Sequence, residues 1–302
     1  MVRPGYLKGL RVKHASARSG LAAVLASLLL TPPAMAEVPI RIAASGHATV
    51  PVVGSFGEHQ FVIDTGAEGS AIYEDFANTH AIPDAGSMEL QGQTGASSLA
   101  TASIEALTLD GVRKGPIEAV KLPPRTDGVP LAGIVGLDIF GDRTLDFDLP
   151  RQRVALLAPG QVPSGLLTNP AAATPTAGEL LTVPVRIGSV TATAVIDTGA
   201  RKTRINWNLA RLLGIAPEDL SAGDTIYGAT NVALETGATE VQDVHLGDRH
   251  LAVAPVLVAD LNVFEVFGVA DRPAVILGMD WLLETRMVVD FPGRQVWFEP
   301  AM

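Results

Sequence analysis

The hexapeptide VIDTGA occupies residues 62–67 and recurs unchanged at residues 195–200. The two aspartates, Asp64 and Asp197, are 197 − 64 = 133 residues apart, about the length of one small domain. At ~1 in 20 per position, chance recurrence of six residues in a chain this long has a probability of roughly one in a thousand. The pair therefore indicates an internal duplication in which each half supplies one carboxylate.

Residues on both sides of the hexapeptide repeat as well. Downstream, residues 134–138 (IVGLD) match residues 276–280 (ILGMD), and Asp148 matches Asp290, at an offset of 142. Upstream, each copy follows two short apolar runs separated by a glycine-containing turn, the pattern of a β-hairpin that delivers an aspartate at a strand end. The nine-residue difference between the offsets predicts an insertion in the second half, in the surface-loop-like residues 260–273.

The rest of the chain favours an all-β fold with little helix. The best helix pattern is WNLARLLGI, which starts at Trp207, and Asp138 and Asp280 are each placed to N-cap a short helix. Residues 159–178 are rich in Pro, Ala, Gly, Ser and Thr and predict a linker. The expected organisation is a signal peptide (1–36), an N-terminal lobe (37–158), this linker, and a C-terminal lobe (179–302).

The first 36 residues predict a secreted or periplasmic protein. Five basic residues and no acidic ones precede the apolar run at residues 21–30, and Ala34-Met35-Ala36 gives the small-x-small pattern of a cleavage site. The run is too short to span a bilayer comfortably. A cleaved signal peptide, with no stable membrane anchor afterwards, is the first interpretation, and an uncleaved anchor or a mis-assigned start is the alternative.

Composition excludes several classes of function. The chain has 302 residues, 47% hydrophobic and 18% charged, and contains no cysteine, so disulfides, thiol nucleophiles and Cys-ligated zinc are excluded. Without residues 1–36 the net charge is 17 − 32 = −15, which argues against nucleic-acid binding. The histidines after residue 36 show no metal-binding spacing, so we predict no metal and no cofactor; they are His47, His59, His80, His245 and His250.

Two facing carboxyl groups can perform acid/base chemistry that one cannot. A lone Asp-Thr-Gly is most simply a turn, but two copies in matched apolar settings point to one shared site. Carboxyls held about 3 Å apart cannot both ionise cheaply, so the pair keeps one proton. The ionised member can then take a proton from water while the protonated member polarises a substrate carbonyl. We expect Asp64 and Asp197 to form this pair, with the proton unassigned between them.

VIDTGA followed by IVGLD, and VIDTGA followed by ILGMD, resemble the retropepsin-type branch of the aspartic proteases, in which Ala follows Asp-Thr-Gly. The resemblance covers nearly all of the chain after residue 36, once per half. It implies two pseudo-twofold related β-barrel lobes with an active-site cleft between them. Retroviral members assemble the site from two identical subunits, whereas this chain resembles a fused, single-chain version and is expected to be a monomer.

The resemblance also implies residue roles. Asp64 and Asp197 would be catalytic, Thr65 and Thr198 would cross-link the two active-site loops, and the remaining loop residues would support them. Those supporting residues are Gly66, Ala67, Gly199 and Ala200, together with Gly136 and Gly278 in the segment beneath each loop. Ser70 and Thr203 fall where the family has a hydroxyl residue. Glu68 and Arg201, at matched positions, are candidates for an ion pair across the pseudo-twofold axis.

Each half should also carry a substrate-covering flap. The candidates are LQGQTGAS, with Gly92 and Gly95, and TIYGATN, with Tyr227 and Gly228. Glycine-rich hairpin tips occur in any β protein, so a purely structural role for each remains an equal alternative.

The first functional hypothesis is therefore an aspartic endopeptidase acting on a peptide or protein substrate. A second is a non-catalytic peptide-binding or scaffolding protein on the same fold. In a third, the protein is the same enzyme, but its site is formed by the N-terminal lobe of one chain and the C-terminal lobe of another, which the linker would allow.

Overall fold

Alternation of apolar and polar residues builds the hairpins that carry the repeated hexapeptide. In the strand Leu181–Ile187, the side chains of Val183, Val185 and Ile187 are buried and those of Pro184 and Arg186 are exposed. This period of two places one face of the strand in the core. The computed structural model describes residues 37–92, 95–227 and 233–301, so the predicted signal peptide lies outside the described residues.

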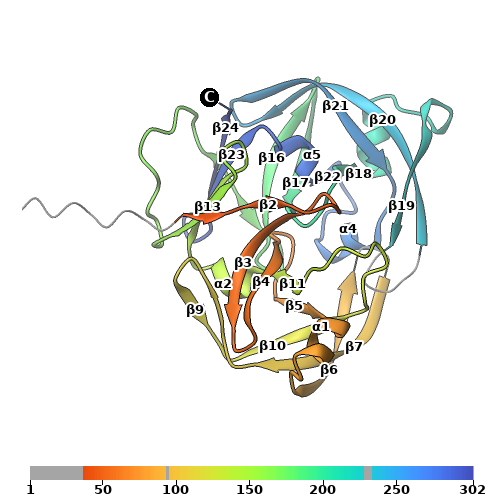
Figure 1. The fold of residues 1–302 in the computed structure, drawn as a ribbon. Helices are drawn as coiled ribbons and strands as arrows, with labels where there is room; N and C mark the ends of the chain where they lie inside the picture. Colours follow the sequence, from red (N-terminus) through yellow and green to blue (C-terminus); the bar gives the residue numbers. More distant parts are fainter. Residues whose placement is uncertain (1–36, 93–94, 228–232, 302) are drawn as a thin grey trace, which may run out of the picture. The chain divides into compact units, whose positions relative to one another are not determined.

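The first half is a succession of short strands with two short helices (Figure 1). Its elements are β1 (Val38–Pro39), β2 (Arg41–Ile42), β3 (Ala48–Gly54), β4 (Gly57–Ile63), β5 (Ala71–Tyr73), α1 (Glu74–Thr79), β6 (Asp84–Gly92), β7 (Gly95–Ile104), β8 (Leu107–Leu109), β9 (Val112–Lys114), β10 (Ile117–Leu122), β11 (Gly133–Val135), α2 (Leu137–Phe140), β12 (Thr144–Asp148) and β13 (Arg153–Leu157).

The second half follows a similar order, with two long strands where the first half has the four strands β7 to β10, and with an added 3₁₀ helix and an added α-helix. Its elements are β16 (Leu181–Ile187), β17 (Val190–Ile196), β18 (Arg204–Ile205), α3 (Trp207–Leu212), the 3₁₀ helix η1 (Pro217–Asp219), β19 (Ser221–Tyr227), β20 (Ala233–Leu246), β21 (Arg249–Val258), α4 (Asn262–Val266), β22 (Ala274–Leu277), α5 (Met279–Leu282), β23 (Thr285–Asp290) and β24 (Gln295–Pro300). The helix predicted from Trp207 is α3.

Strand register shows the duplication directly. β11 runs parallel to β4 with Ile134 opposite Val62, and β22 runs parallel to β17 with Ile276 opposite Val195. Val62 and Val195 are 133 residues apart, and Ile134 and Ile276 are 142 apart, which are the offsets of the sequence repeat. The two halves therefore also share the same strand pairing. The all-β, two-lobed prediction is confirmed.

Three sheets organise the described residues (Figure 1). One is built from the first half in the order β6-β7-β10-β5-β11-β4-β3-β8-β9, with β2 beside β3, and another from the second half in the order β15-β16-β17-β22-β18-β21-β20-β19. The third, β1-β13-β12-β23-β24-β14, takes strands from both halves. In it β12 pairs antiparallel with β23, and Arg286 binds Asp146 through two hydrogen bonds of 2.8 and 2.7 Å. The halves are therefore joined through a common sheet.

The predicted linker contributes two short strands to these sheets. β14 (Ala171–Ala172) pairs with β24, and β15 (Thr174–Pro175) pairs with β16. Glu299 accepts hydrogen bonds from the backbone of Leu167 and Thr168. The segment between the lobes is thus tied at several points to the second half.

The insertion of the second half is a helix, which corrects the surface-loop interpretation of residues 260–273. Lys121 pairs with Ile72 in the first half as Val258 pairs with Ile205 in the second, so Lys121 and Val258 are equivalent positions. They are 258 − 121 = 137 residues apart in the sequence. Five of the nine extra residues therefore fall between β21 and β22, where α4 lies. Phe264 is 1% exposed, within an apolar cluster that includes Ile276. The apolar side chains of α4 are buried because they cover this cluster.

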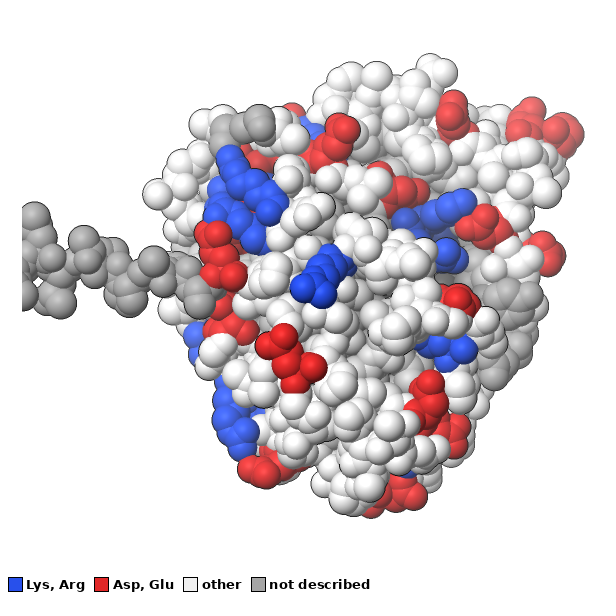
Figure 2. Space-filling view, viewed as in Figure 1, with Lys and Arg blue, Asp and Glu red and all other residues white. Residues whose placement is uncertain are grey.

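The surface of the described residues carries both signs of charge. On the face in Figure 2, Lys and Arg side chains are interspersed with Asp and Glu. No helix among the described residues is long and apolar enough to cross a membrane. The predictions of no nucleic-acid partner and no membrane anchor remain predictions.

Candidate active site

The two repeated aspartates occupy equivalent places, immediately after β4 and β17. The Asp64 backbone N–H donates to the carbonyl of Val135 at 3.0 Å, and that of Asp197 donates to the carbonyl of Leu277 at 3.1 Å. The two residues are 9% and 7% exposed. The downstream segments IVGLD and ILGMD therefore hold the end of each aspartate-bearing strand.

Thr65 and Thr198 link the two loops by reciprocal hydrogen bonds. The Thr65 hydroxyl accepts from the Thr198 N–H at 3.1 Å and donates to the Ile196 carbonyl at 2.8 Å. The Thr198 hydroxyl accepts from the Thr65 N–H at 3.0 Å and donates to the Ile63 carbonyl at 2.7 Å. All four bonds are buried, so each threonine satisfies two backbone groups of the other half.

The glycines after the threonines bring each carboxyl against the opposite loop. A β-carbon added at Gly66 would lie 2.6 Å from Cγ of Asp197, and one added at Gly199 would lie 2.2 Å from Oδ2 of Asp64. No side chain fits at either position. The Gly66 N–H donates to Asp64 Oδ1 at 2.8 Å and the Ala200 N–H to Asp197 Oδ1 at 2.9 Å. Asp64 and Asp197 thus meet between the halves.

The electrostatics of the two carboxyls differ. Burial, followed by the charge of Asp197, raises the pKa of Asp64 well above its ordinary value. Burial also raises the pKa of Asp197, but the positive charge of Arg204 is the largest effect opposing that rise. A hydrogen bond between the two carboxyls raises the pKa of Asp64 and lowers that of Asp197. The charge of Arg204 therefore favours the ionised form of Asp197, in a pair that shares one proton.

Ser70 and Asp138 fix the first loop. The Ser70 hydroxyl donates to Asp138 Oδ1 at 2.7 Å and its N–H to Oδ2 at 3.0 Å, while the Gly136 N–H donates to the Ser70 hydroxyl at 3.2 Å. Asp138 does not N-cap α2, because Gly136 holds the cap position. The N-cap prediction was wrong: the carboxylate binds the active-site loop 68 residues earlier.

The second half repeats this network with Thr203 and Asp280. The Thr203 hydroxyl and N–H donate to Asp280 Oδ1 at 2.7 and 2.8 Å, and the Gly278 N–H donates to the Thr203 hydroxyl at 3.0 Å. Gly278 is the N-cap of α5, so the N-cap prediction for Asp280 was wrong for the same reason.

The remaining loop residues contribute backbone. The carbonyl of Ala67 accepts from the Leu137 N–H at 2.9 Å, and that of Ala200 accepts from the Met279 N–H at 2.8 Å. A β-carbon at Gly136 would lie 2.6 Å from the Ala67 carbonyl oxygen, and one at Gly278 would lie 2.6 Å from backbone carbon of Lys202. Each loop therefore rests directly on the segment beneath it.

The flap candidates are hairpins, with partly described tips. Gly92 and Gly95 pair at the tip of the β6–β7 hairpin, and the Asn262 side chain of α4 donates to the Gly92 carbonyl at 3.2 Å. Tyr227 pairs with Ala233 at the end of β19, and Gly228 lies outside the described residues. A pocket of about 430 Å³ lies beside α4, lined by Asn262 and seven neighbours, with neither aspartate in its wall. The roles of the flaps stay predictions.

The matched charges after the hexapeptide do not pair. Arg201 donates to the Ser45 carbonyl at 3.4 Å, and Lys202 binds Asp224 at 3.0 Å. Glu68 forms no ion pair with either among the described residues. The predicted Glu68–Arg201 pair was wrong because Arg201 turns toward the loop before β3.

Arg204 is a residue of the site that the sequence patterns did not predict. It lies in β18 where the first half has Ala71, and it is 7% exposed. Within the described part of the chain, its Nε and Nη1 atoms have no hydrogen-bond partner. An alignment of the two halves at an offset of 133 would have revealed a cation at an otherwise small, apolar position.

Comparison with known families agrees with this geometry. The sequence profile of the aspartyl protease family matches the chain twice, at residues 48–139 and 183–281. The chain belongs to the aspartyl protease family and is a duplicated, retropepsin-like member. Membership supports a protease-like function and a peptide substrate in general terms. A search of curated proteins found no match.

The threonine cross-link should be essential for stability. Thr65→Val keeps the shape of the side chain but leaves the Ile196 carbonyl and the Thr198 N–H buried without partners. We expect the free energy of unfolding to fall by about 2–4 kcal/mol, measured by urea titration. Thr65→Ser retains the hydroxyl and should change it by less than about 1 kcal/mol. Equal effects of the two substitutions would contradict the proposed role of the hydroxyl.

Proposed function

We propose that this protein is a secreted or periplasmic aspartic endopeptidase, in which Asp64 and Asp197 activate a water molecule to hydrolyse a peptide bond. The observation that carries the proposal is the meeting of two buried carboxyls, each against the glycine of the opposite loop. Family membership adds independent support.

The charge of Arg204, which lowers the pKa of Asp197, supports distinct roles for the two carboxyls. Ionised Asp197 takes a proton from the water as the oxygen attacks the peptide carbonyl carbon. Protonated Asp64 gives its proton to the carbonyl oxygen, which produces a tetrahedral diol. Collapse of the diol breaks the C–N bond as the amine nitrogen receives a proton from Asp197, and a diol hydroxyl returns a proton to Asp64. The chemistry requires both carboxyls and forms no covalent bond between the protein and the substrate.

The two hairpins that are flap candidates suit an extended substrate. A peptide can add a strand to a hairpin through main-chain hydrogen bonds. The β6–β7 tip already reaches α4 of the other half through Asn262. We therefore place the substrate between this hairpin and the two carboxyls.

Substitution of either aspartate tests the mechanism. Asp64→Asn and Asp197→Asn should each lower kcat/KM on casein or a peptide library by at least about a thousandfold, because each removes half of the acid/base pair. Unfolding curves would confirm that the fold is kept. Asp110→Asn, a remote and partly buried substitution, should leave activity unchanged.

Two outcomes would contradict the proposal. Cleavage by the Asp64→Asn/Asp197→Asn double variant would exclude the carboxyl pair. Peptide binding by the wild type without any statine-sensitive cleavage would favour the non-catalytic binding protein.

Arg204 should set the pH range of activity. Its positive charge lowers the pKa of Asp197, so in Arg204→Met that pKa should rise and the ionised form should appear only at higher pH. The acidic limb of the kcat/KM profile should move to higher pH. Arg249→Met provides a control, because Arg249 is a similarly buried guanidinium of the same half, bound to the Trp281 carbonyl. An unchanged limb in Arg204→Met would contradict this role.

Export is supported by the sequence of residues 1–36, with its basic start, apolar run and Ala34-Met35-Ala36. Cleavage after Ala36 should leave Glu37 as the first residue of the exported protein, as N-terminal sequencing would show. An intact Met1 in the exported fraction would favour the uncleaved anchor instead.

A further inference from the structure

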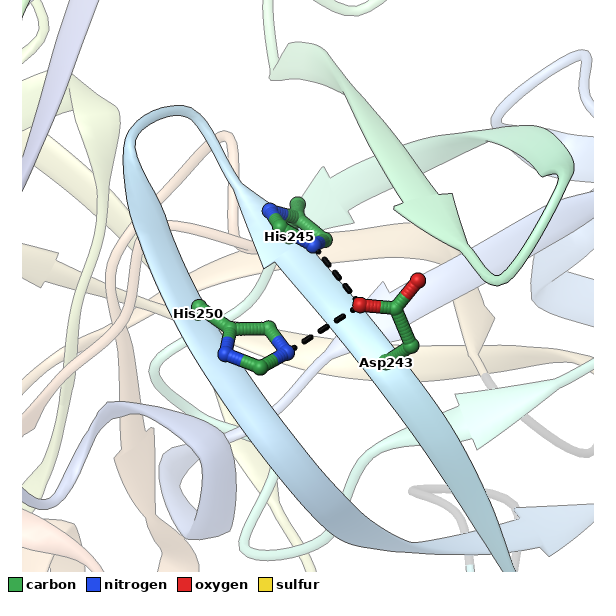
Figure 3. Close-up of side chains that lie close together, drawn as sticks. All are labelled: Asp243, His245 and His250. Carbon is green, nitrogen blue, oxygen red and sulfur yellow. Dashed lines mark hydrogen bonds and ion pairs between the residues drawn. The ribbon is translucent and has the colours of Figure 1, made fainter.

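A second cluster of titratable side chains lies on the β20–β21 hairpin (Figure 3). His245 of β20 lies directly opposite His250 of β21, and Asp243 precedes His245 by two residues on the same face of β20. Their candidate ligand atoms all lie within 4.8 Å of one another. The cluster combines two imidazoles and a carboxylate.

The three side chains already converge on one point. Nε2 of His245 lies 2.9 Å from Asp243 Oδ1, and Nε2 of His250 lies 3.1 Å from the same oxygen. The two imidazole rings stack with centroids 4.6 Å apart and planes inclined by 30°. In a tetrahedral zinc site with bonds of about 2.0–2.1 Å, neighbouring ligand atoms are about 3.3 Å apart. Small side-chain rotations would therefore admit an ion.

Arg186 orients the carboxylate of Asp243. Arg186 of β16 binds its other oxygen, Oδ2, at 2.9 Å and leaves Oδ1 facing the histidines. The backbone of Asp243 has φ 54°, an uncommon conformation for a residue other than glycine. A hydrogen bond like the one from Arg186 to Asp243 is the usual way in which a metal-ligating carboxylate is oriented.

We propose that Asp243, His245 and His250 bind a divalent transition-metal ion of the zinc type and fasten β20 to β21 near their connecting turn. Imidazole nitrogens with a carboxylate oxygen suit such ions better than Mg²⁺ or Ca²⁺. On binding, each imidazole presents the Nε2 lone pair, and its proton moves through water to Nδ1. Asp243 and His250 are half-exposed, so water completes the coordination.

The cluster is separate from the aspartate pair. β20 begins at Ala233, which pairs with Tyr227 of the flap candidate, and carries Asp243 and His245 at its opposite end. The proposed ion therefore supports the hairpin and takes no part in hydrolysis. The prediction of no metal rested on spacings along the chain, whereas this cluster depends on cross-strand register.

Zinc binding to the untagged full chain tests the proposal. Isothermal titration with ZnCl₂ should show one saturable site, and zinc should raise the midpoint of thermal unfolding. His245→Gln and His250→Gln should each weaken binding at least about tenfold, since each removes a ligand. His59→Gln and His80→Gln are matched controls, because those rings also lie 4.8 Å apart. MgCl₂ and CaCl₂ should give no comparable effect.

The proposal fails if the wild type shows no saturable zinc binding, or if His245→Gln and His250→Gln bind zinc like the wild type. If a variant does not fold, X-ray absorption of the zinc-loaded wild type supplies an independent readout. Two imidazole ligands with added oxygen would support the site, and a shell of oxygen alone would overturn it.

Discussion

The reciprocal hydrogen bonds of Thr65 and Thr198 are the interaction on which the site depends. A loop that leaves the end of a buried strand exposes backbone groups that its own sheet does not pair. Here the Ile63 and Ile196 carbonyls and the two threonine N–H groups form hydrogen bonds with the other half. Neither loop can therefore be completed alone. The same bonds fix the distance between the loops, so they bring the two buried carboxyls together.

Each half also has a local support that makes its loop rigid. Ser70 with Asp138, and Thr203 with Asp280, connect the loop to the start of the helix beneath it. The hydroxyl belongs to a serine in the first half and to a threonine in the second, but it donates and accepts the equivalent hydrogen bonds in both. Close contact of the loop with Gly136 or Gly278 completes the support. The paired loops thus rest on parts of the chain far away in sequence, which explains why the downstream segments repeat together with the hexapeptide.

The sequence could predict the features whose pattern is local. The strand ends at Asp64 and Asp197, the helix from Trp207 and the duplicated order of strands all follow from short apolar periods and an exact repeat. It could not predict the partners of Asp138 and Asp280, since an aspartate near a helix start has a simpler use as a cap. The buried position of α4 and the convergence of Asp243 with two histidines depend on tertiary packing and cross-strand register. The periodicity of a single short segment can predict neither the burial of α4 nor this cluster.

Fusion of the two halves has a physical consequence for the carboxyl pair. When two identical subunits build such a site, symmetry gives both carboxyls the same surroundings, so only the shared proton distinguishes them. In one chain the halves can differ, and here Arg204 stands where the first half has Ala71. A buried cation whose Nε and Nη1 atoms have no hydrogen-bond partner in the described structure is costly, and proximity to an ionised carboxylate offsets that cost. The charge therefore favours ionisation of Asp197 over Asp64. The duplication keeps the geometry of a symmetric site while allowing its two acids to have different protonation states.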